Sequence, residues 1–395
     1  MRLSSRARGI SPSPTLSVDA RAKALAAAGE KIINFGVGEP DFDTPEYIKE
    51  AAVKALARGM TKYTPVPGTL ELREAICQKL IRENHLEYSP SEIVVSCGAK
   101  HSLYNTLQVL VEEGDEVIIP APYWVSYMEQ VKLTGARPVV VKTRPENDFK
   151  ILPEELSDAL TPHTRLLILN SPSNPTGGVY TEQELRVLAD IAVKAGIWVL
   201  SDEIYEKLVY DGTVHFSIAS ISPEIKAQTI LVNGVSKAYA MTGWRIGYAA
   251  APAPISKAMA DLQSHSTSNP TSIAQAATIA ALLGPQDSVA AMLKAFAERR
   301  NYILHRLEGI PGIACRKPGG AFYVFPDVSS YFGRPIRGKT VSSGTDIATL
   351  LLEEAKVAVV PGSAFGDDRF IRLSYATSLE NIAEGMDRII AALQG

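Results

Sequence analysis

The stretch Ser236-Lys-Ala-Tyr-Ala-Met-Thr-Gly-Trp-Arg245 joins two apolar, strand-like runs, residues 229–235 and 246–251. Lys237 follows the end of the first run, and Arg245 comes directly before the second. In α/β sheets, ligands bind at the carboxyl ends of the strands. A lysine just after a strand therefore marks a candidate site as well as a sheet.

The lysine and the arginine suit one kind of ligand. A lysine at a strand end is partly desolvated, which lowers its pKa and frees the neutral amine. A neutral amine forms a Schiff base with an aldehyde or a carbonyl group. Arg245 can hold a phosphate by paired, charge-assisted hydrogen bonds. Together these roles predict a site for pyridoxal phosphate, although either residue alone is more simply a surface lysine or a packing arginine.

Composition excludes several other classes of protein. The chain has 395 residues, 46% hydrophobic and 21% charged, which is ordinary for a soluble globular protein of two domains. A net charge of −3 implies no general attraction to nucleic acid or to an anionic membrane. No apolar run approaches the roughly 18 residues of a membrane helix. Three scattered cysteines and six scattered histidines show no redox or metal-ligand spacing, so we expect a cytoplasmic protein without a metal.

Short apolar runs alternate with amphipathic segments over most of the chain, which predicts an α/β fold with a mostly parallel sheet flanked by helices. The predicted strands are residues 92–97, 116–120, 138–142, 166–170, 198–202, 230–233 and 246–251. The predicted helices between them are residues 46–58, 69–83, 100–111, 124–133 and 181–194, the last opened by a Thr-x-x-Glu capping box.

The pattern changes near residue 285. Helices are predicted at 288–307, 345–355 and 379–393, with strands at 321–325, 358–360 and 370–374. This indicates a smaller α+β domain. We therefore expect an N-terminal arm and part of the small domain in 1–44, a large cofactor-binding domain in 45–287 and a small C-terminal domain in 288–395. Residues 1–18 lack the apolar core of a secretory signal, and Pro12 and Pro14 would break a targeting helix.

Two further segments carry features of cofactor binding. In Ser96-Cys-Gly-Ala-Lys100, Gly98 permits a tight turn, and the Ala99 and Lys100 amides begin a helix that can bind phosphate; an ordinary glycine turn is the alternative. Trp124 follows a predicted strand and can stack on a pyridine ring, or it can belong to the core.

Two polar residues follow later strands. In Asn170-Ser-Pro-Ser-Asn-Pro-Thr-Gly177, the proline after Asn174 restricts that residue to an extended or cis-linked geometry, so its amide can donate to a phenolate oxygen. Asp202, at the end of a strand, needs a cationic partner if buried. A protonated pyridine nitrogen is such a cation; Tyr205 can reach the phenolate of the same ring, and a helix N-cap is the alternative for Asp202.

An arginine inside an apolar strand predicts an anion. Arg372 interrupts the run 370–374, and its planar fork suits a substrate carboxylate, although an internal salt bridge would also account for it. The Gly38 amide, in Gly36-Val-Gly-Glu-Pro-Asp41, can hold the same carboxylate without side-chain obstruction.

The chain closely resembles the class I aminotransferases of the fold-type I pyridoxal-phosphate enzymes, from about Ile10 to the C-terminus. Within them it is most similar to the bacterial subgroup of aspartate aminotransferases that includes prephenate-using relatives. The motifs that carry the resemblance are Gly36-Val-Gly-Glu-Pro-Asp-Phe42, Lys62-Tyr-Thr64, Tyr123-Trp124, Asn170 to Gly177, Ser201-Asp-Glu-Ile-Tyr205, Ser236-Lys237 through Gly247-Tyr248, and Arg372-Leu-Ser-Tyr-Ala-Thr377.

The resemblance implies a role for each site residue. Lys237 would be the Schiff-base lysine and the acid–base group, and Asp202 would pair with the pyridine nitrogen. The other roles are phenolate binding by Asn174 and Tyr205, ring stacking by Trp124, phosphate binding by Ala99, Lys100 (through its backbone) and Arg245, and α-carboxylate binding by Gly38 and Arg372. Ser236 is a further cofactor-binding residue. Tyr63 would reach the phosphate of a neighbouring subunit, so the resemblance also implies a homodimer with shared active sites.

The resemblance defines the distal end of the substrate less closely. It implies that the Lys100 side chain meets a distal carboxylate, assisted by Ser11, Ser13 or Thr15, of which Ser13 is our choice. Prephenate-using relatives often carry lysine where this chain has Ser11, which favours aspartate. The predicted reaction is ping-pong transfer of the amino group of L-aspartate to 2-oxoglutarate. The alternatives are an aminotransferase for aromatic amino acids, alanine or prephenate, a β-lyase, and a non-catalytic regulator of the same fold.

Overall fold

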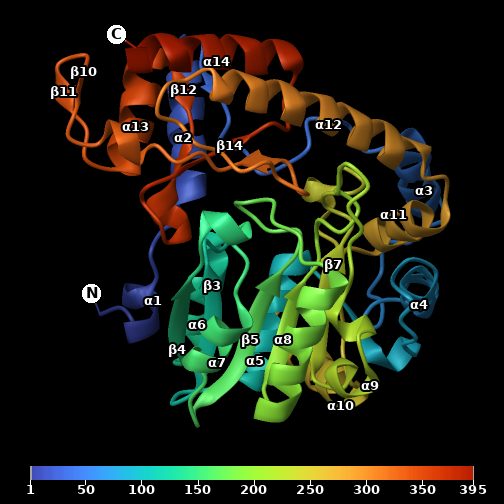
Figure 1. The fold of residues 1–395 in the computed structure, drawn as a ribbon. Helices are drawn as coiled ribbons and strands as arrows, with labels where there is room; N and C mark the ends of the chain where they lie inside the picture. The colour runs from blue at the N-terminus through green and yellow to red at the C-terminus, as the bar shows by residue number, and fades with distance from the viewer. Residues whose placement is uncertain (1, 395) are drawn as a thin grey trace.

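A seven-stranded sheet forms the centre of the larger part of the molecule in the computed structural model, which describes residues 2–394 (Figure 1). In spatial order its strands are β2 (Ile93–Ser96), β8 (Gly247–Ala250), β7 (Thr229–Gly234), β6 (Trp198–Asp202), β5 (Thr164–Asn170), β3 (Glu116–Ala121) and β4 (Arg137–Lys142). All seven predicted strands of this domain are present. The bounds differ from the prediction by at most two residues, and those of β6 are the same.

The sheet is mostly parallel, as predicted. Strands β4, β3, β5, β6 and β7 run parallel to one another, and only β8 is antiparallel to its neighbours. Strands β2, β7 and β8 are buried along their whole length. Continuous apolar runs are typical of strands covered on both faces. The carboxyl ends of β3, β5, β6 and β7 therefore lie at one edge.

Helices cover both faces of this sheet (Figure 1). They are α3 (Glu46–Ala57), α4 (Leu70–Asn84), α5 (Ala99–Leu110), α6 (Val125–Thr134), α7 (Pro153–Ala159), α8 (Glu182–Ala195), α9 (Pro223–Lys226), α10 (Ala253–Ser264) and α11 (Ser272–Leu283). The predicted capping box opens α8, because the Glu184 N–H donates to Thr181 Oγ1 at 3.3 Å and the Thr181 N–H donates to Glu184 Oε2 at 2.8 Å. Helices α7, α9, α10 and α11 were not predicted.

The C-terminal elements form a second layer above the sheet edge (Figure 1). They are α12 (Asp287–Glu308), β9 (Tyr323–Val324), β10 (Pro335–Ile336), β11 (Lys339–Thr340), α13 (Gly344–Leu350), β12 (Val357–Ala358), β13 (Val360–Pro361), β14 (Ile371–Ser374) and α14 (Leu379–Gln394). Strands β13, β14 and β9 make an antiparallel sheet, and β12 pairs in parallel with β1 (Ile33–Asn34). This pairing ties the N-terminal segment to the C-terminal layer.

The N-terminal arm is more helical than the prolines suggested. It contains α1 (Ser5–Gly9) and α2 (Pro14–Ala27). Pro14 does not break a helix here, because it occupies the first turn of α2, where the missing N–H has no intrahelical partner. Helix α2 lies among the C-terminal elements in Figure 1.

Among residues 2–394 no single helix is long and apolar enough to cross a bilayer. By length and composition alone, α11 and α12 would suffice together, with a bend of 79° between them.

Candidate active site

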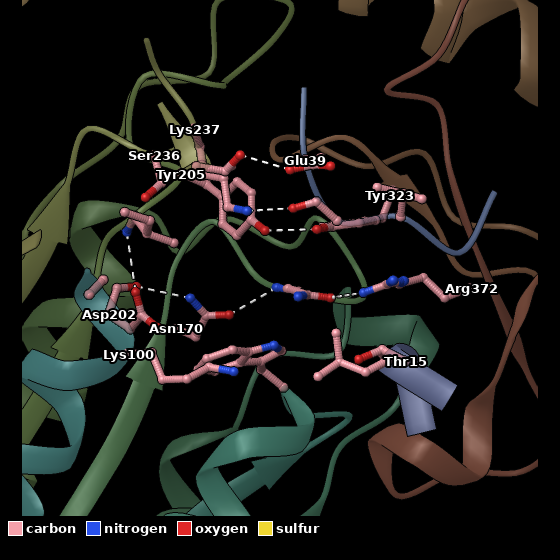
Figure 2. A pocket seen from close by; sticks show the side chains of 18 of the residues that line it. Thr15, Glu39, Lys100, Asn170, Asp202, Tyr205, Ser236, Lys237, Tyr323 and Arg372 are labelled. Atoms are coloured by element: carbon pink, nitrogen blue, oxygen red, sulfur yellow. Dashed lines mark hydrogen bonds between the residues drawn. The ribbon is translucent and has the colours of Figure 1, made fainter. Parts of the chain in front are cut away.

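A cavity of about 450 Å³ lies between the sheet edge and the C-terminal layer (Figure 2). Every predicted site residue except Ser13 and Tyr63 lines it. These residues are Gly38, Ala99, Lys100, Trp124, Asn174, Asp202, Tyr205, Ser236, Lys237, Arg245 and Arg372. The fold thus brings together side chains from segments more than 300 positions apart in the sequence.

Lys237 extends from the segment after β7 into this cavity, where its ammonium donates to the Gly38 carbonyl. Burial lowers the Lys237 pKa from its ordinary 10.5 to about 8. The nearby Glu39 carboxylate opposes this shift, whereas Arg372 and Arg245 add to it. A useful fraction of the neutral amine is therefore present near neutral pH, as a nucleophile or a base requires.

Asp202 ends β6 and is only 3% exposed. Burial raises its pKa to about 6, although the Tyr127 hydroxyl donates to Oδ2 at 2.6 Å and the Ile204 N–H donates to Oδ1 at 3.3 Å. No helix begins at Asp202 in the described chain, so the N-cap alternative is wrong. Tyr127 was not predicted. Its only signal was its place three residues after Trp124 on α6, which puts both on one helix face.

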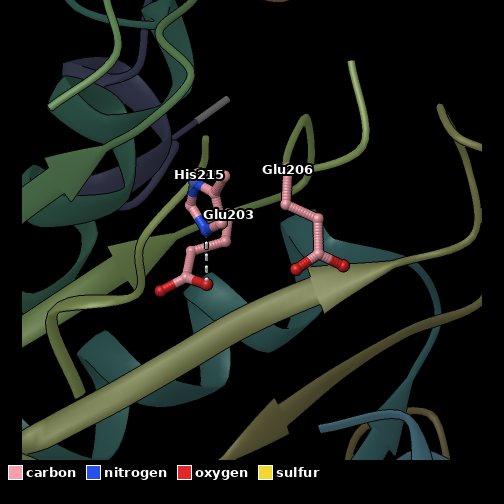
Figure 3. A group of neighbouring side chains, drawn as sticks. All are labelled: Glu203, Glu206 and His215. Carbon is pink, nitrogen blue, oxygen red and sulfur yellow. Dashed lines mark hydrogen bonds and ion pairs between the residues drawn. The ribbon is translucent and has the colours of Figure 1, made fainter. Parts of the chain in front are cut away.

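A second acidic group lies next to Asp202 in the sequence but outside the cavity (Figure 3). Possible ligand atoms of Glu203, Glu206 and His215 lie within 4.8 Å of one another, as in a metal site. However, protein donors already occupy the carboxylates. Glu203 accepts from Ser201 (2.9 Å), Ser217 (2.6 Å) and His215 (3.0 Å), and Glu206 accepts from Lys79 and from Asn84 (2.9 Å). Burial is the largest single influence and disfavours ionised Glu206, but the charges of Lys79 and His215 and the hydrogen bonds from Asn84 and Lys79 together outweigh it, so the pKa falls to about 2. The group is an internal ion-pair network.

Asn174 and Tyr205 are held from behind by residues that the sequence analysis did not assign. Asn170, at the end of β5, accepts from the Asn174 N–H at 2.9 Å and donates to the Asp202 carbonyl at 2.9 Å. The Tyr205 and Tyr323 hydroxyls are 2.8 Å apart. The Asn174–Pro175 peptide is cis, one of the two geometries expected. Both side chains therefore reach the cavity from hydrogen-bonded supports.

Arg372 is 2% exposed, and its guanidinium has no acidic partner. It donates to Asn174 Oδ1 (2.9 Å) and to the Gly36 carbonyl (2.8 Å), and it lies 4.4 Å from the Tyr323 ring centroid. Its Nε is buried without a partner, and no carboxylate of residues 2–394 forms an ion pair with it. The internal salt bridge considered for this residue is therefore absent. A buried guanidinium in this state suits an anionic ligand.

A corner with features that suit a phosphate lies where α5 begins. Gly98 precedes the helix at φ +89°, and the first helical amides, Ala99 and Lys100, have no partner within the helix. Arg245 lies beside them and donates to the Thr242 carbonyl (2.9 Å) and the Cys97 carbonyl (3.2 Å). A Cβ on Gly98 would collide with the Arg245 guanidinium, so glycine leaves the space that this arginine occupies. The corner combines free amides, a helix dipole and a cation.

Two of the residues considered for a distal carboxylate, Lys100 and Thr15, line the cavity. Lys100 Nζ lies 4.9 Å from the centroid of the Trp124 ring, and burial lowers the Lys100 pKa, with a smaller contribution from Arg245. Thr15 lines the cavity, whereas Ser13 does not and instead bonds to it, with the two hydroxyl oxygens 2.9 Å apart. Tyr63 lies outside this cavity and is 92% exposed.

A strand-end lysine, a buried aspartate, a phosphate-binding corner and a buried arginine define a site for a phosphorylated cofactor and a carboxylate substrate. The family described as aminotransferase class I and II matches residues 30–389, and the chain belongs to this family.

Similar proteins cover the whole chain. It is 54% identical over 390 residues to an aspartate aminotransferase of Geobacillus stearothermophilus, with 98% of each chain covered. It is 48% identical to an aspartate/prephenate aminotransferase of Nitrosomonas europaea, with 100% of each covered. The crystal structure of the Rhizobium meliloti aspartate aminotransferase matches with a TM-score of 0.97 at 46% identity, covering 100% of this chain and 99% of that one. A Thermus thermophilus aspartate aminotransferase with maleate matches at 0.94 and 44%, with 100% of both covered.

Enzymes of this family use pyridoxal phosphate, and the residues present fit that cofactor. Three observations support the fit: the Gly98 space filled by Arg245 at a helix N-terminus, the buried Asp202 without a cationic partner in hydrogen-bond contact, and the lowered pKa of Lys237. These suit a phosphate, a pyridinium and an aldehyde respectively.

The lowered pKa of Lys237 leads to a pH-dependent rate of cofactor attachment. Below pH 8 the neutral fraction of its amine falls about tenfold per pH unit, so the rate should rise with pH and level off above about 8. Stopped-flow absorbance of apoprotein mixed with pyridoxal phosphate measures this rate, with Lys237→Ala as the blank. A rate that keeps rising to pH 10.5 would contradict the proposed environment.

Tyr127→Phe should weaken cofactor binding by roughly tenfold, because Asp202 loses a hydrogen bond that stabilises its anion. The pKa of Asp202 should rise further above 6, so affinity should begin to fall at a higher pH than in the wild type. Equilibrium titration of apoprotein with pyridoxal phosphate across pH 5–8 measures both effects. Tyr104→Phe, which removes a hydroxyl from a residue of α5 that does not line the cavity, is the matched control. Equal affinities and equal pH midpoints for the two variants would exclude the role of Tyr127.

Proposed function

We propose that the protein transfers the amino group of L-aspartate to 2-oxoglutarate, giving oxaloacetate and L-glutamate by a ping-pong mechanism. The observation that carries this proposal is the distribution of cations in the cavity. Lys237 and Arg245 have roles toward the cofactor, and Lys23 is exposed and paired with Asp19 at 2.8 Å. Arg372 and Lys100 are the two cavity cations left to bind a substrate, and two cations suit a substrate with two carboxylates.

The names of similar proteins favour the same substrate. Relatives 52–54% identical over almost the whole chain are aspartate aminotransferases, and the Thermus thermophilus structure was obtained with maleate, a dicarboxylate. Prephenate is a second candidate because of the relatives at 48% identity. Ser11, where prephenate-using relatives often have lysine, argues against it.

The roles of the residues follow from their positions. The bound cofactor supplies an electron sink for the electrons released at the substrate Cα. Lys237 takes the Cα proton and returns it to the cofactor C4′. Asp202 keeps the ring nitrogen protonated, Asn174 and Tyr205 donate to the phenolate oxygen, and Trp124 covers the ring.

The remaining groups position the ligands. Ser236, Arg245 and the Ala99 and Lys100 amides hold the phosphate. Arg372 and the Gly38 amide hold the α-carboxylate. The Lys100 side chain meets the distal carboxylate, with Thr15 and its partner Ser13 beside it.

We also propose a homodimer, in which Tyr63 completes the phosphate site of the partner. Its exposed phenol cannot serve its own cavity, and Val53, Leu56 and Leu70 in the same region are at least half exposed.

The divisions 1–44, 45–287 and 288–395 remain our proposed domains, supported by the β1–β12 pairing. The free cysteines support a reduced, cytoplasmic setting, and neither nucleic acid nor a membrane is a proposed partner.

The decisive experiment is the absorption spectrum of the purified holoenzyme before and after L-aspartate is added alone. Loss of the band of the lysine-bound cofactor, with growth of the band of its amino form, would support the aspartate half-reaction. If aspartate left the band unchanged and an aromatic amino acid converted it, the aromatic amino acid would replace aspartate as the proposed substrate. No band after addition of pyridoxal phosphate would refute the assignment of Lys237.

Lys100→Met should lower kcat/KM for aspartate by roughly 10–100-fold, because one charge-assisted contact to the distal carboxylate is lost. Methionine keeps the apolar stem against Trp124, so packing changes little. L-Alanine, which lacks a distal carboxylate, is the control substrate. Equal losses for the two substrates, measured by single-turnover kinetics, would exclude the role of the Lys100 side chain.

A further inference from the structure

One side chain connects the two parts of the wall that face the proposed substrate carboxylates. Asn34 donates from Nδ2 to Asp19 Oδ1 at 2.9 Å, and its Oδ1 accepts from the Gly36 N–H at 2.9 Å. Asp19 lies on α2, and Gly36 begins the loop that contains Gly38. Asn34 is therefore hydrogen-bonded to the helix at one end of its amide and to the loop at the other.

The loop belongs to the α-carboxylate side of the cavity. The Gly36 carbonyl accepts from Arg372 at 2.8 Å, and the Gly38 carbonyl accepts from Lys237. A movement of this loop would therefore shift both the arginine that binds the substrate and the lysine that moves the proton.

Helix α2 forms the distal-carboxylate part of the same wall. Its residues Thr15, Leu16, Asp19 and Lys23 line the cavity; Thr15, Asp19 and Lys23 are about one turn apart along a single face, and Leu16 is adjacent to Thr15. Thr15 and its hydrogen-bond partner Ser13 are the hydroxyls that we place beside the distal carboxylate. Figure 2 shows Thr15 and Arg372 on the same side of the cavity, with α2 entering behind Thr15.

The main chain at Asn34 is held in place by strand pairing. The Asn34 backbone pairs with Ala358 in the β1–β12 ladder, and the Phe35 N–H donates to the Ala358 carbonyl at 2.8 Å. A Cβ on Gly36 would lie 3.2 Å from Asn34 Oδ1 and 3.3 Å from Val18 Cγ1, so loop and helix already approach closely. With its main chain fixed, the Asn34 amide transmits the position of the loop to the helix.

We propose that the Asn34–Asp19 hydrogen bond is a positioning bridge that sets the spacing between the α-carboxylate loop and the distal-carboxylate helix. It selects for substrates with two carboxylates at that spacing. The inference rests on the proposed function, because it assumes a dicarboxylic substrate held by both sides of the cavity. Asn34 and Asp19 act through Arg372, Gly38 and Thr15, so they are positioning residues.

The chain allows a test by exchanging the two side chains. Asn34→Asp keeps an acceptor for the Gly36 N–H but places two carboxylates against each other, which breaks the bridge. When Asp19→Asn is added, the amide at position 19 can donate to the carboxylate at position 34. The hydrogen bond is then restored with its direction reversed. The control is Arg21→Gln, which removes an exposed α2 ion pair (Arg21–Glu353, 3.2 Å) on a residue that does not line the cavity.

Two ligands distinguish a loss of the bridge from a general loss of active-site structure. Spectral titration of each holoenzyme with maleate reports on a dicarboxylate, and the half-reaction with L-alanine reports on the α-carboxylate alone. Asn34→Asp should weaken maleate binding by about fivefold or more, the size of one hydrogen bond, and change kcat/KM for alanine by less than about twofold. The exchanged double variant should recover most of the maleate affinity, and Arg21→Gln should match the wild type.

Each other outcome is informative. Equal losses for maleate and alanine, or no recovery in the exchanged variant, would overturn the bridge while leaving the proposed function in place. Failure of the wild-type holoenzyme to bind maleate would overturn both. If Asn34→Asp does not fold, Asp19→Ala combined with Lys23→Met removes the same hydrogen bond without repulsion and without freeing the Lys23 ammonium, and is expected to show the same selective loss. Equal maleate affinity of this double variant and wild type would then overturn the bridge.

Discussion

Lys237→Ala should reduce transamination by at least about 10⁴-fold, the upper range for removal of a positioned acid–base group. The loss should be larger than that of any other single variant of the cavity, because the same amine also attaches the cofactor. No other lysine can replace it at this position. Lys100, the next lysine lining the cavity, stacks its ammonium on Trp124.

Lys237→Ala should reduce cofactor affinity much less than it reduces turnover. Arg245, the α5 amides and Asp202 remain in place, and each of them contacts the cofactor independently of Lys237 in our proposal. Equilibrium titration with pyridoxal phosphate and single-turnover kinetics with aspartate separate the two properties. Lys257→Ala, which removes a surface lysine paired with Asp261 at 2.6 Å, is the matched control. Steady-state transamination retained by Lys237→Ala would refute the assignment.

Strands and their ends could be predicted because they depend on local sequence. Runs such as 198–202 are apolar and end on polar residues, and a strand buried on both faces leaves few other interpretations. Asp202 was found in this way. Its partner Tyr127, and Tyr323, the partner of Tyr205, were not, because they lie in a helix and a strand where an aromatic residue is ordinarily part of the core.

The N-terminal helix was missed for a related reason. Pro14 breaks a helix interior but is favoured at the first helical position, and only the start of the helix distinguishes the two cases. Helix α2 has one buried residue, Ala22, so its apolar period is weak and its place depends on contacts with distant strands. The Asn34–Asp19 contact depends on the same placement, and no pattern in the sequence indicates it.

The remaining features that the sequence did not predict depend on contacts between residues far apart in the chain. The internal salt bridge considered for Arg372 was a reasonable alternative, since a buried arginine normally has an acid nearby. Only the fold shows that its neighbours are a carbonyl, an amide and two aromatic rings. The choice of Ser13 over Thr15 remains a prediction. The structure places Thr15 on the cavity wall and Ser13 behind it, so kinetics of the two alanine variants with aspartate would decide between them.

Asp202→Asn is expected to give the second largest effect, a fall of about 10³-fold in the rate of the aspartate half-reaction, the size found when a preorganised electrostatic partner is removed. Asparagine can still accept from the Tyr127 hydroxyl, so the variant removes the charge and preserves the packing. Without an anion at this position the ring nitrogen loses its proton, and the electrons released at Cα are no longer withdrawn into a cation. Burial is what gives the charge its effect, since it excludes the water that would screen it.

The pH dependence gives an independent check on the same carboxylate. Its pKa of about 6 lies above its ordinary 3.8, so in the cofactor-free protein the anion is lost as pH falls through 6. Cofactor affinity of the wild type should fall in that range, and affinity of Asp202→Asn should be lower but flat. The matched control is Glu203→Gln, which neutralises the adjacent buried carboxylate outside the cavity. If Glu203→Gln slowed the half-reaction as much as Asp202→Asn, loss of buried charge in general would explain the result, and the pairing of Asp202 with the ring nitrogen would be wrong.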